Sequence, residues 1–287
     1  ETSISFRIFK QYIEKKYGKK EAARRIIATT DAHKGTLKAL ADKEGYAEFV
    51  VPDDIGGRFS VFTAVGLVPL ALAGIDIKAL MEGSKKAMED YSKESIEEND
   101  AYKYAVARRI LDDKGYSAEM FVTYNLQLQM VAEWWKQLFG ESEGKDGKGI
   151  LPTSGCFSTD LHSLGQFVQE GRKCLYETLL LVDEMPGDML FPEDEENLDN
   201  MNYLAGKSIS WVNEQAQKGT LKAHSDNGNV PNIEIHLKDN SAYSFGYMIY
   251  FFMRACGMSC YLLGINPFNQ PGVEVYKKEM FKLLGKE

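Results

Sequence analysis

The segment AEMFVTYNLQLQMVAEWWKQLFGESEGKDGKGILPT (118–153) places an amphipathic helix pattern between two short apolar runs. These runs, AEMFVTY (118–124) and GILPT (149–153), are typical of buried strands. The alternation continues toward the C-terminus with ETLLLVD (177–183) and NIEIHL (232–237). Strands separated by helices favour a parallel sheet covered by helices. The sequence therefore predicts an α/β fold, a three-layer α/β/α sandwich with a mainly parallel sheet.

A similar but shorter alternation precedes this segment. A helix pattern runs to about Tyr17, RRIIATTD (24–31) is apolar, GTLKALADKEG (35–45) is again helical, and AEFVV (47–51) is strand-like. We expect two α/β layers of this kind, the first incomplete, with a boundary near residue 70. The acidic stretch EDEENLD (193–199) is expected to begin a helix, because carboxylates favour a helix N-terminus.

Two apolar stretches require a test for membrane insertion. Val61 to Ile75 is shorter than the roughly 20 residues that span a bilayer, and Tyr247 to Ile265 contains Arg254. We expect both to form buried core helices. The first 18 residues also lack the apolar region of a signal peptide.

The net charge and the positions of the Cys and His residues disfavour several classes of protein and of site. The 287 residues carry 34 Lys and Arg against 42 Asp and Glu, a net charge of −8. A basic nucleic-acid binder is disfavoured. Four Cys at 156, 174, 256 and 260 form no CxxC pair, and the four His are scattered. A disulfide framework and a structural zinc site are therefore disfavoured.

The glycine-rich stretch GESEGKDGKG (140–149) is not a phosphate loop, because its glycine spacing is too short and Asp146 stands where a Walker loop needs Ser or Thr. Glu141 and Glu143 are then either solvated loop carboxylates or members of an active-site loop.

Three further segments have both a structural and a functional interpretation. In VPDDIGGRFS (51–60), Gly56 and Gly57 can form an ordinary turn with an exposed Arg58, or let the backbone approach a ligand. In FSTDLHSLGQF (157–167), Ser158, Thr159 or Asp160 can cap a helix and place His162 in its first turn, where it is either a surface residue or a catalyst.

The C-terminal helix pattern aligns Val273, Lys277, Met280 and Leu284 on one stripe, with Lys278 beside it, four residues after Glu274. Lys277 either lies at the edge of a packed helix or reaches an oxygen in a cleft.

Three long segments carry a specific family resemblance: VPDDIGGRFSVFTAVGLVPLALAG (51–74), GESEGKDGKGILPTSGCFSTDLHSLGQFVQEG (140–171) and GINPFNQPGVEVYKKEM (264–280). Together they resemble the glucose-6-phosphate isomerase family in its shorter bacterial form. The resemblance implies sugar-isomerase (SIS) domains: the C-terminal part of one in residues 1–70, a complete one in 71–270, and a C-terminal helix in 271–287. It also implies a cytoplasmic homodimer that interconverts glucose 6-phosphate and fructose 6-phosphate without metal or organic cofactor, and it implies neither a nucleic-acid nor a membrane partner.

The same resemblance assigns site residues. It implies catalytic roles for Arg58, Glu141, His162 and Lys277, and substrate binding by Gly57, Arg58 and Gln270. In the family, the residue that matches His162 is contributed to the neighbouring subunit's site.

These roles agree with the chemistry. His162 and Lys277 would open the sugar ring, and Glu141 would carry a proton between C2 and C1 through a cis-enediol. Arg58 would stabilise the enediolate charge.

The chain departs from the family pattern at its start, where only Glu1 and Thr2 of the Thr-Glu-Thr ending of a phosphate-binding loop are present. We therefore expect a fragment with little or no activity, in which residues 1–70 expose a sheet edge and apolar surface. Two alternatives stay open: a non-catalytic SIS-type module that binds sugar phosphates, and a secreted signalling role.

Overall fold

A computed structural model describes residues 2–285 of the chain. Glu1, which the sequence places at the end of a phosphate-binding turn, lies outside the described residues. The chain forms two compact units, Glu1–Ile77 and Lys78–Glu287. The division predicted near residue 70 would fall within helix α4 (Ala64–Leu72). The assignment of SIS domains to parts of the chain stays a prediction.

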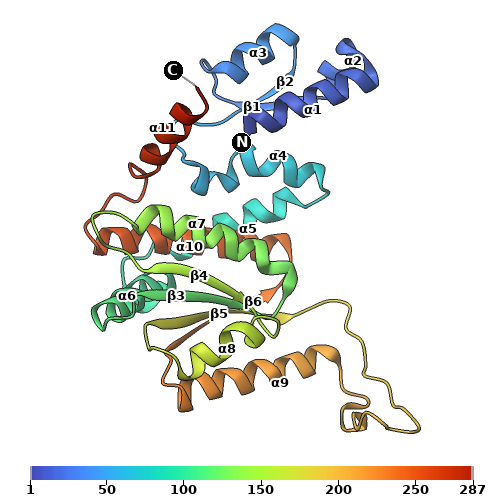
Figure 1. The fold of residues 1–287 in the computed structure, drawn as a ribbon, viewed down its shortest axis with the longest axis vertical. Helices are drawn as coiled ribbons and strands as arrows, with labels where there is room; N and C mark the ends of the chain where they lie inside the picture. Colours follow the sequence, from blue (N-terminus) through green and yellow to red (C-terminus); the bar gives the residue numbers. More distant parts are fainter. Residues whose placement is uncertain (1, 286–287) are drawn as a thin grey trace. The chain divides into compact units, whose positions relative to one another are not determined.

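A four-stranded parallel sheet forms the centre of the second unit (Figure 1). Its strands are β3 (Ala118–Thr123), β4 (Leu151–Cys156), β5 (Leu175–Glu184) and β6 (Asn232–Asp239). They lie in the order β4-β3-β5-β6, and every pairing is parallel. All four strands predicted in this part of the chain are confirmed.

Aromatic side chains fill one side of this sheet. Here lie α6 (Asp100–Asp113), α7 (Gln129–Glu143) and α10 (Ala242–Leu262). Phe121 of β3 lies 5.1 Å from Trp135 of α7 and 5.7 Å from Phe252 of α10, ring centroid to ring centroid. The core helix expected over 247–265 is thus confirmed. No helix within residues 2–285 is long and apolar enough to cross a membrane.

The opposite side of the sheet is covered by α8 (Leu161–Glu170) and α9 (Ile209–Lys222) (Figure 1). Met120 and Val122 alternate with Phe121 along β3, so they face this second core, where Val168 of α8 joins them. Because helices cover both faces, the predicted three-layer arrangement is confirmed.

Helix α5 (Ile77–Asp90) crosses α10 closely at two glycines, one on each helix. A Cβ on Gly83 would lie 1.9 Å from the carbonyl oxygen of Tyr243, and one on Gly246 would lie 1.9 Å from that of Leu80. Since neither position has room for a side chain, the crossing depends on both glycines. The rest of the unit contains the short helices η2 (Ile96–Glu98), η3 (Leu126–Leu128), η4 (Asn202–Leu204) and η5 (Ala223–Asn227), and the C-terminal α11 (Val273–Leu283).

The first unit is smaller and has a small core. It contains α1 (Thr2–Tyr17), α2 (Lys19–Arg24), β1 (Ile27–Thr30), α3 (Thr36–Glu44), β2 (Ala47–Val50), η1 (Gly57–Phe62) and α4. Strands β1 and β2 form a parallel pair, which confirms both predicted strands. The core is built on Ala28, Ala41 and Tyr46. Apolar α1 residues, among them Ile4, Ile8 and Phe9, are exposed, as expected for residues 1–70.

Two predictions about secondary structure and burial are wrong. No helix begins in the stretch 193–199, which the structure describes in full. Asp194 there accepts hydrogen bonds from the backbone N–H groups of Glu196 and Asn197, so the side chain stabilises a turn. In Val61–Ile75, none of the residues of α4, all described, is buried, and Leu72 is 73% exposed. A nine-residue helix that is apolar on all sides does not bury every face in this structure.

Candidate functional site

Glu141 lies in the last turn of α7, and not in the loop that the sequence suggested. Its side chain is half-buried, and its Oε1 accepts a hydrogen bond from Nε2 of Gln137, one turn earlier, at 3.3 Å. The glycine-rich loop begins only after α7 ends at Glu143. A helix-borne carboxylate has a better defined direction than one on a loop.

Two lysines tie this loop to a distant segment of the chain. Lys145 Nζ donates a hydrogen bond to the carbonyl oxygen of Asn266, and Lys148 Nζ donates one to that of Leu263 at 2.7 Å. The segment from 263 to 266 follows α10 and leads to Gln270 and α11. The end of α7 is therefore held beside the chain that carries the C-terminal site candidates.

Lys277 on α11 has an electrostatic connection to Glu141. Its Nζ donates a hydrogen bond to Oε1 of Glu274 at 3.1 Å, and this contact raises the pKa of Lys277, with smaller contributions that include the charge of Glu141. Glu274 thus pairs with Lys277, three residues on. The charge of Glu141 thus acts on Lys277, and the raised pKa keeps Lys277 as an ammonium group at neutral pH.

Gln270 lies immediately before α11. Its backbone carbonyl accepts a hydrogen bond from the N–H of Val273, which forms the first turn leading into the helix. Gln270 is thereby placed on the same segment as Lys277, and its side chain is exposed.

His162 lies at the opposite edge of the sheet from Glu141. Helix α7 runs from the end of β3 back to the start of β4, so Glu141 lies at the edge where the strands begin. Asp160 occupies the N-cap position of α8 but makes no capping hydrogen bond; its Oδ2 accepts one from the backbone N–H of Cys156 at 2.7 Å instead. Helix α8 follows the end of β4, so the exposed His162 lies at the edge where the strands end. Six residues of β4 separate these edges by about 20 Å. Within one chain, His162 does not join Glu141 and Lys277.

Gly57 and Arg58 belong to the first unit, where they begin η1. Arg58 is only 1% exposed, so the expectation of an ordinary turn with an exposed arginine is wrong. Its guanidinium carbon lies 5.4 Å from the ring centroid of Phe59. Gly56 has an extended backbone with φ of −69°, and a Cβ on either glycine would meet open space. The backbone therefore does not require glycine here, while the open space is compatible with a close ligand.

Comparison with known proteins gives one consistent family. The sequence profile described as phosphoglucose isomerase matches residues 1–287. The chain belongs to the phosphoglucose isomerase family. Curated relatives named glucose-6-phosphate isomerase include those of Staphylococcus saprophyticus, 60% identical over 287 residues, and Clostridioides difficile, 57% identical over 286 residues. Each comparison covers 100% of the chain but only 65% and 64% of the relatives' own lengths, so the chain spans just under two thirds of them.

Solved structures support the phosphoglucose isomerase fold. A hypothetical protein from Thermus thermophilus superposes with a TM-score of 0.91 at 29% identity, over 99% of this chain and 68% of that one. A glucose-6-phosphate isomerase from Chlamydia trachomatis superposes with a TM-score of 0.81 at 20% identity, over 97% and 56% respectively. The second likeness shows the fold alone.

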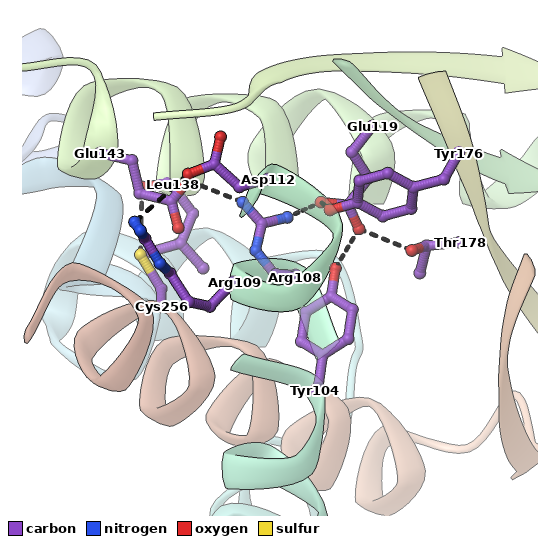
Figure 2. A network of polar contacts seen from close by, with 10 residues as sticks. All are labelled: Tyr104, Arg108, Arg109, Asp112, Glu119, Leu138, Glu143, Tyr176, Thr178 and Cys256. Carbon is purple, nitrogen blue, oxygen red and sulfur yellow. Dashed lines mark hydrogen bonds and ion pairs between the residues drawn. The ribbon is translucent and has the colours of Figure 1, made fainter. Parts of the chain in front are cut away.

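A buried polar cluster beside the end of α7 was not predicted from the sequence (Figure 2). Arg108 of α6 donates a hydrogen bond from Nη2 to Oε2 of Glu143 at 2.6 Å, and its Nη1 pairs with Glu119 of β3. Burial acts to lower the pKa of Arg108, but charges around it, Glu143 first, raise the pKa overall. Glu143 is only 1% exposed, so its interpretation as a solvated loop carboxylate is wrong.

The sequence contains a signal for part of this cluster. Trp135, Phe139 and Glu143 follow one another at steps of four in α7, so the helical period that buries the two aromatic residues also buries Glu143. On α6, Arg108 continues the buried stripe of Ala101 and Tyr104 in the same way. A charged residue that continues an apolar stripe on each of two helices indicates that both charges are buried, although the pattern does not say with which partner each one pairs.

Proposed function

We propose that the protein carrying this chain is an aldose–ketose isomerase that interconverts glucose 6-phosphate and fructose 6-phosphate. The observation that carries the proposal is the match of residues 1–287 to the phosphoglucose isomerase family; in the same chain the charge of Glu141 acts on Lys277, 136 positions further along. As part of the same proposal, the reaction serves glycolysis and gluconeogenesis in the cytoplasm. Residues 71–270 then form a complete SIS domain, 1–70 the C-terminal part of another, and 271–287 the C-terminal helix.

The first step opens the sugar ring. One group must protonate the ring oxygen while another removes the proton of the anomeric hydroxyl. Lys277 enters the reaction protonated, because its contact with Glu274 raises its pKa above 10.5. His162 completes the pair as the second group that exchanges a proton with the sugar. Gln270, on the segment before α11, binds the substrate.

The second step moves a proton between C2 and C1. Glu141 serves as the base that removes the C2 proton and returns it to C1 of the cis-enediol. Arg58, always charged, stabilises the negative charge on the enediolate oxygens and does not compete as an acid, while Gly57 allows the substrate to come close to the backbone.

The third part of the proposal is a homodimer in which His162 acts in the partner's site. Its support is topological: Glu141 and His162 lie at opposite edges of the sheet, about 20 Å apart. Two such chains related by a twofold axis can place His162 of each beside Glu141 of the other.

Isotope exchange tests the proposal. The whole protein is incubated with glucose 6-phosphate in deuterated water, and the C2 proton and the formation of fructose 6-phosphate are followed by NMR. We expect deuterium at C2 together with fructose 6-phosphate. Binding of the sugar phosphate without either change would show a non-catalytic sugar-phosphate module instead.

A further inference from the structure

The last turn of α7 carries two carboxylates with opposite environments. Glu141 is half-buried and accepts a hydrogen bond from Gln137, whereas Glu143 is 1% exposed and paired with Arg108. At 3.6 residues per turn, side chains two positions apart point about 200° from one another around the helix axis. The direction in which Glu143 is fixed therefore also determines the direction of Glu141.

Glu143 is connected to the centre of the sheet through its contact with one arginine, Arg108. Arg108 bridges Glu143 at the end of α7 and Glu119 in β3 (Figure 2). Glu119 is fully buried, and three hydroxyl groups donate hydrogen bonds to its carboxylate: Tyr104 at 2.5 Å, Tyr176 at 2.8 Å and Thr178 at 2.6 Å. The contacts form a continuous path from the middle of the sheet to the turn that carries Glu141.

The charges show that Glu143 is not needed to balance this cluster. One guanidinium faces two carboxylates, and Arg108 with Glu119 already forms a neutral pair. Glu143 Oε1 is buried and has no hydrogen-bond partner among residues 2–285. A buried carboxylate that is neither needed for neutrality nor fully hydrogen-bonded is poorly explained by stability, because an apolar side chain of similar size would pack there at lower cost.

We propose that Glu143 and Arg108 are positioning residues, which fix the last turn of α7 on the sheet and so hold the Glu141 carboxylate where it meets the reacting carbon. This inference rests on the proposed role of Glu141. Proton transfer between two carbons tolerates little displacement of the base, whereas ring opening depends on other groups, His162 and Lys277. Loss of the contact between Arg108 and Glu143 should therefore slow isomerisation more than it slows ring opening.

The test compares Glu143→Leu with Glu143→Gln in the whole protein. Leucine removes the contact with Arg108 but leaves the neutral pair with Glu119, so the fold is expected to persist. Glutamine keeps an oxygen that can accept from Arg108. We expect Glu143→Leu to lower kcat for isomerisation about 10- to 100-fold with little change in KM, and to leave the rate of ring opening within about twofold. Glu143→Gln should restore most of the isomerisation rate.

Glu177→Leu provides the matched control. Glu177 of β5 is likewise 1% exposed and paired with a buried partner, His224, at 2.9 Å, but neither residue belongs to α7. If Glu143 has only a structural role, Glu143→Leu and Glu177→Leu will both lower ring opening and isomerisation in parallel with their loss of thermal stability. That result would overturn the inference.

Glu141→Gln separates this inference from the proposed function. If Glu141→Gln keeps normal turnover, the assignment of the base fails and the positioning role fails with it. If Glu141→Gln abolishes isomerisation while Glu143→Leu behaves like Glu177→Leu, the proposed function stands and only the positioning role is overturned.

Discussion

Glu119 is the most completely hydrogen-bonded of the carboxylates around Arg108, and Tyr104 is its nearest hydroxyl donor. Burial raises the pKa of Tyr104 to about 12, so the phenol stays protonated. Its hydroxyl group therefore donates a hydrogen bond to the Glu119 carboxylate. A hydrogen bond to a charged, water-excluded group contributes more to stability than an exposed one, because its loss leaves part of a buried charge unsolvated.

Tyr104→Phe should therefore lower the free energy of unfolding by about 1.5–3 kcal/mol. The matched control is Tyr102→Phe on the same helix, whose hydroxyl accepts a hydrogen bond from Arg254 at the surface. That substitution should change stability by less than about 0.5 kcal/mol. Urea denaturation of both variants measures the difference. Equal effects would contradict the account of Glu119 as a buried carboxylate that depends on its donors.

Lys277 provides a second test at the scale of one residue. Lys277→Gln should slow ring opening by about 100-fold, because the amide cannot supply a proton. Lys278→Gln is the control and should leave the rate nearly unchanged, because the contact with Glu274 is made by Lys277, one position away. Stopped-flow measurement of the cyclic and open forms of the substrate follows the step.

The pH dependence of that step has a definite sign. A raised pKa means that Lys277 stays protonated through neutral pH and loses its proton only at strongly alkaline pH. Titration of Lys277 should therefore produce no loss of ring-opening rate near neutral pH, and a loss only at strongly alkaline pH. A fall in the rate near neutral pH that disappears in Lys277→Gln would contradict this protonation state.

Among the elements, the crossing of α5 and α10 is the most demanding sterically. Gly246→Ala should lower the free energy of unfolding by about 1–3 kcal/mol, because the new methyl group would overlap the backbone of Leu80. On the same helix, a Cβ on Gly257 would meet no atom within 4 Å. Gly257→Ala should stabilise the protein by about 0.5–1 kcal/mol through its helix propensity. Thermal unfolding of the pair measures both, and destabilisation of equal size at the two positions would refute the close crossing.

The elements differ in how far sequence predicts them. The strand β3 and the other three strands of its sheet have apolar runs flanked by helix patterns, so period and length suffice to place them. The prediction of a helix start in the stretch 193–199 was wrong because Asp and Asn favour turns as strongly as helix starts. Here Asp194 accepts hydrogen bonds from the backbone of its own turn.

Prediction of the site was limited by partners that are distant in sequence. Glu141 was placed in a loop because its glycine-rich surroundings conceal the end of α7. The pairing of Glu143 with Arg108 joins positions 35 residues apart, and no local pattern specifies which buried charges meet. The opposite placement of Glu141 and His162 follows only once β3 and β4 are known to be parallel neighbours.

At the scale of the whole molecule, this opposite placement is the strongest reason to propose a shared site. The acid–base groups that the proposed reaction requires are complete in two chains and incomplete in one. Each site would combine Glu141 and Lys277 of one chain with His162 of the other, so the activity of a variant should depend on the chain with which it pairs.

Subunit complementation measures this most directly. Glu141→Gln and His162→Ala are each prepared alone and as co-expressed mixtures of the whole protein, and the formation of fructose 6-phosphate from glucose 6-phosphate is measured. Each variant alone should be nearly inactive. Random pairing should give one intact site in half of the dimers, and so about a quarter of the wild-type activity. A mixture no more active than its two parents would contradict a site shared between chains.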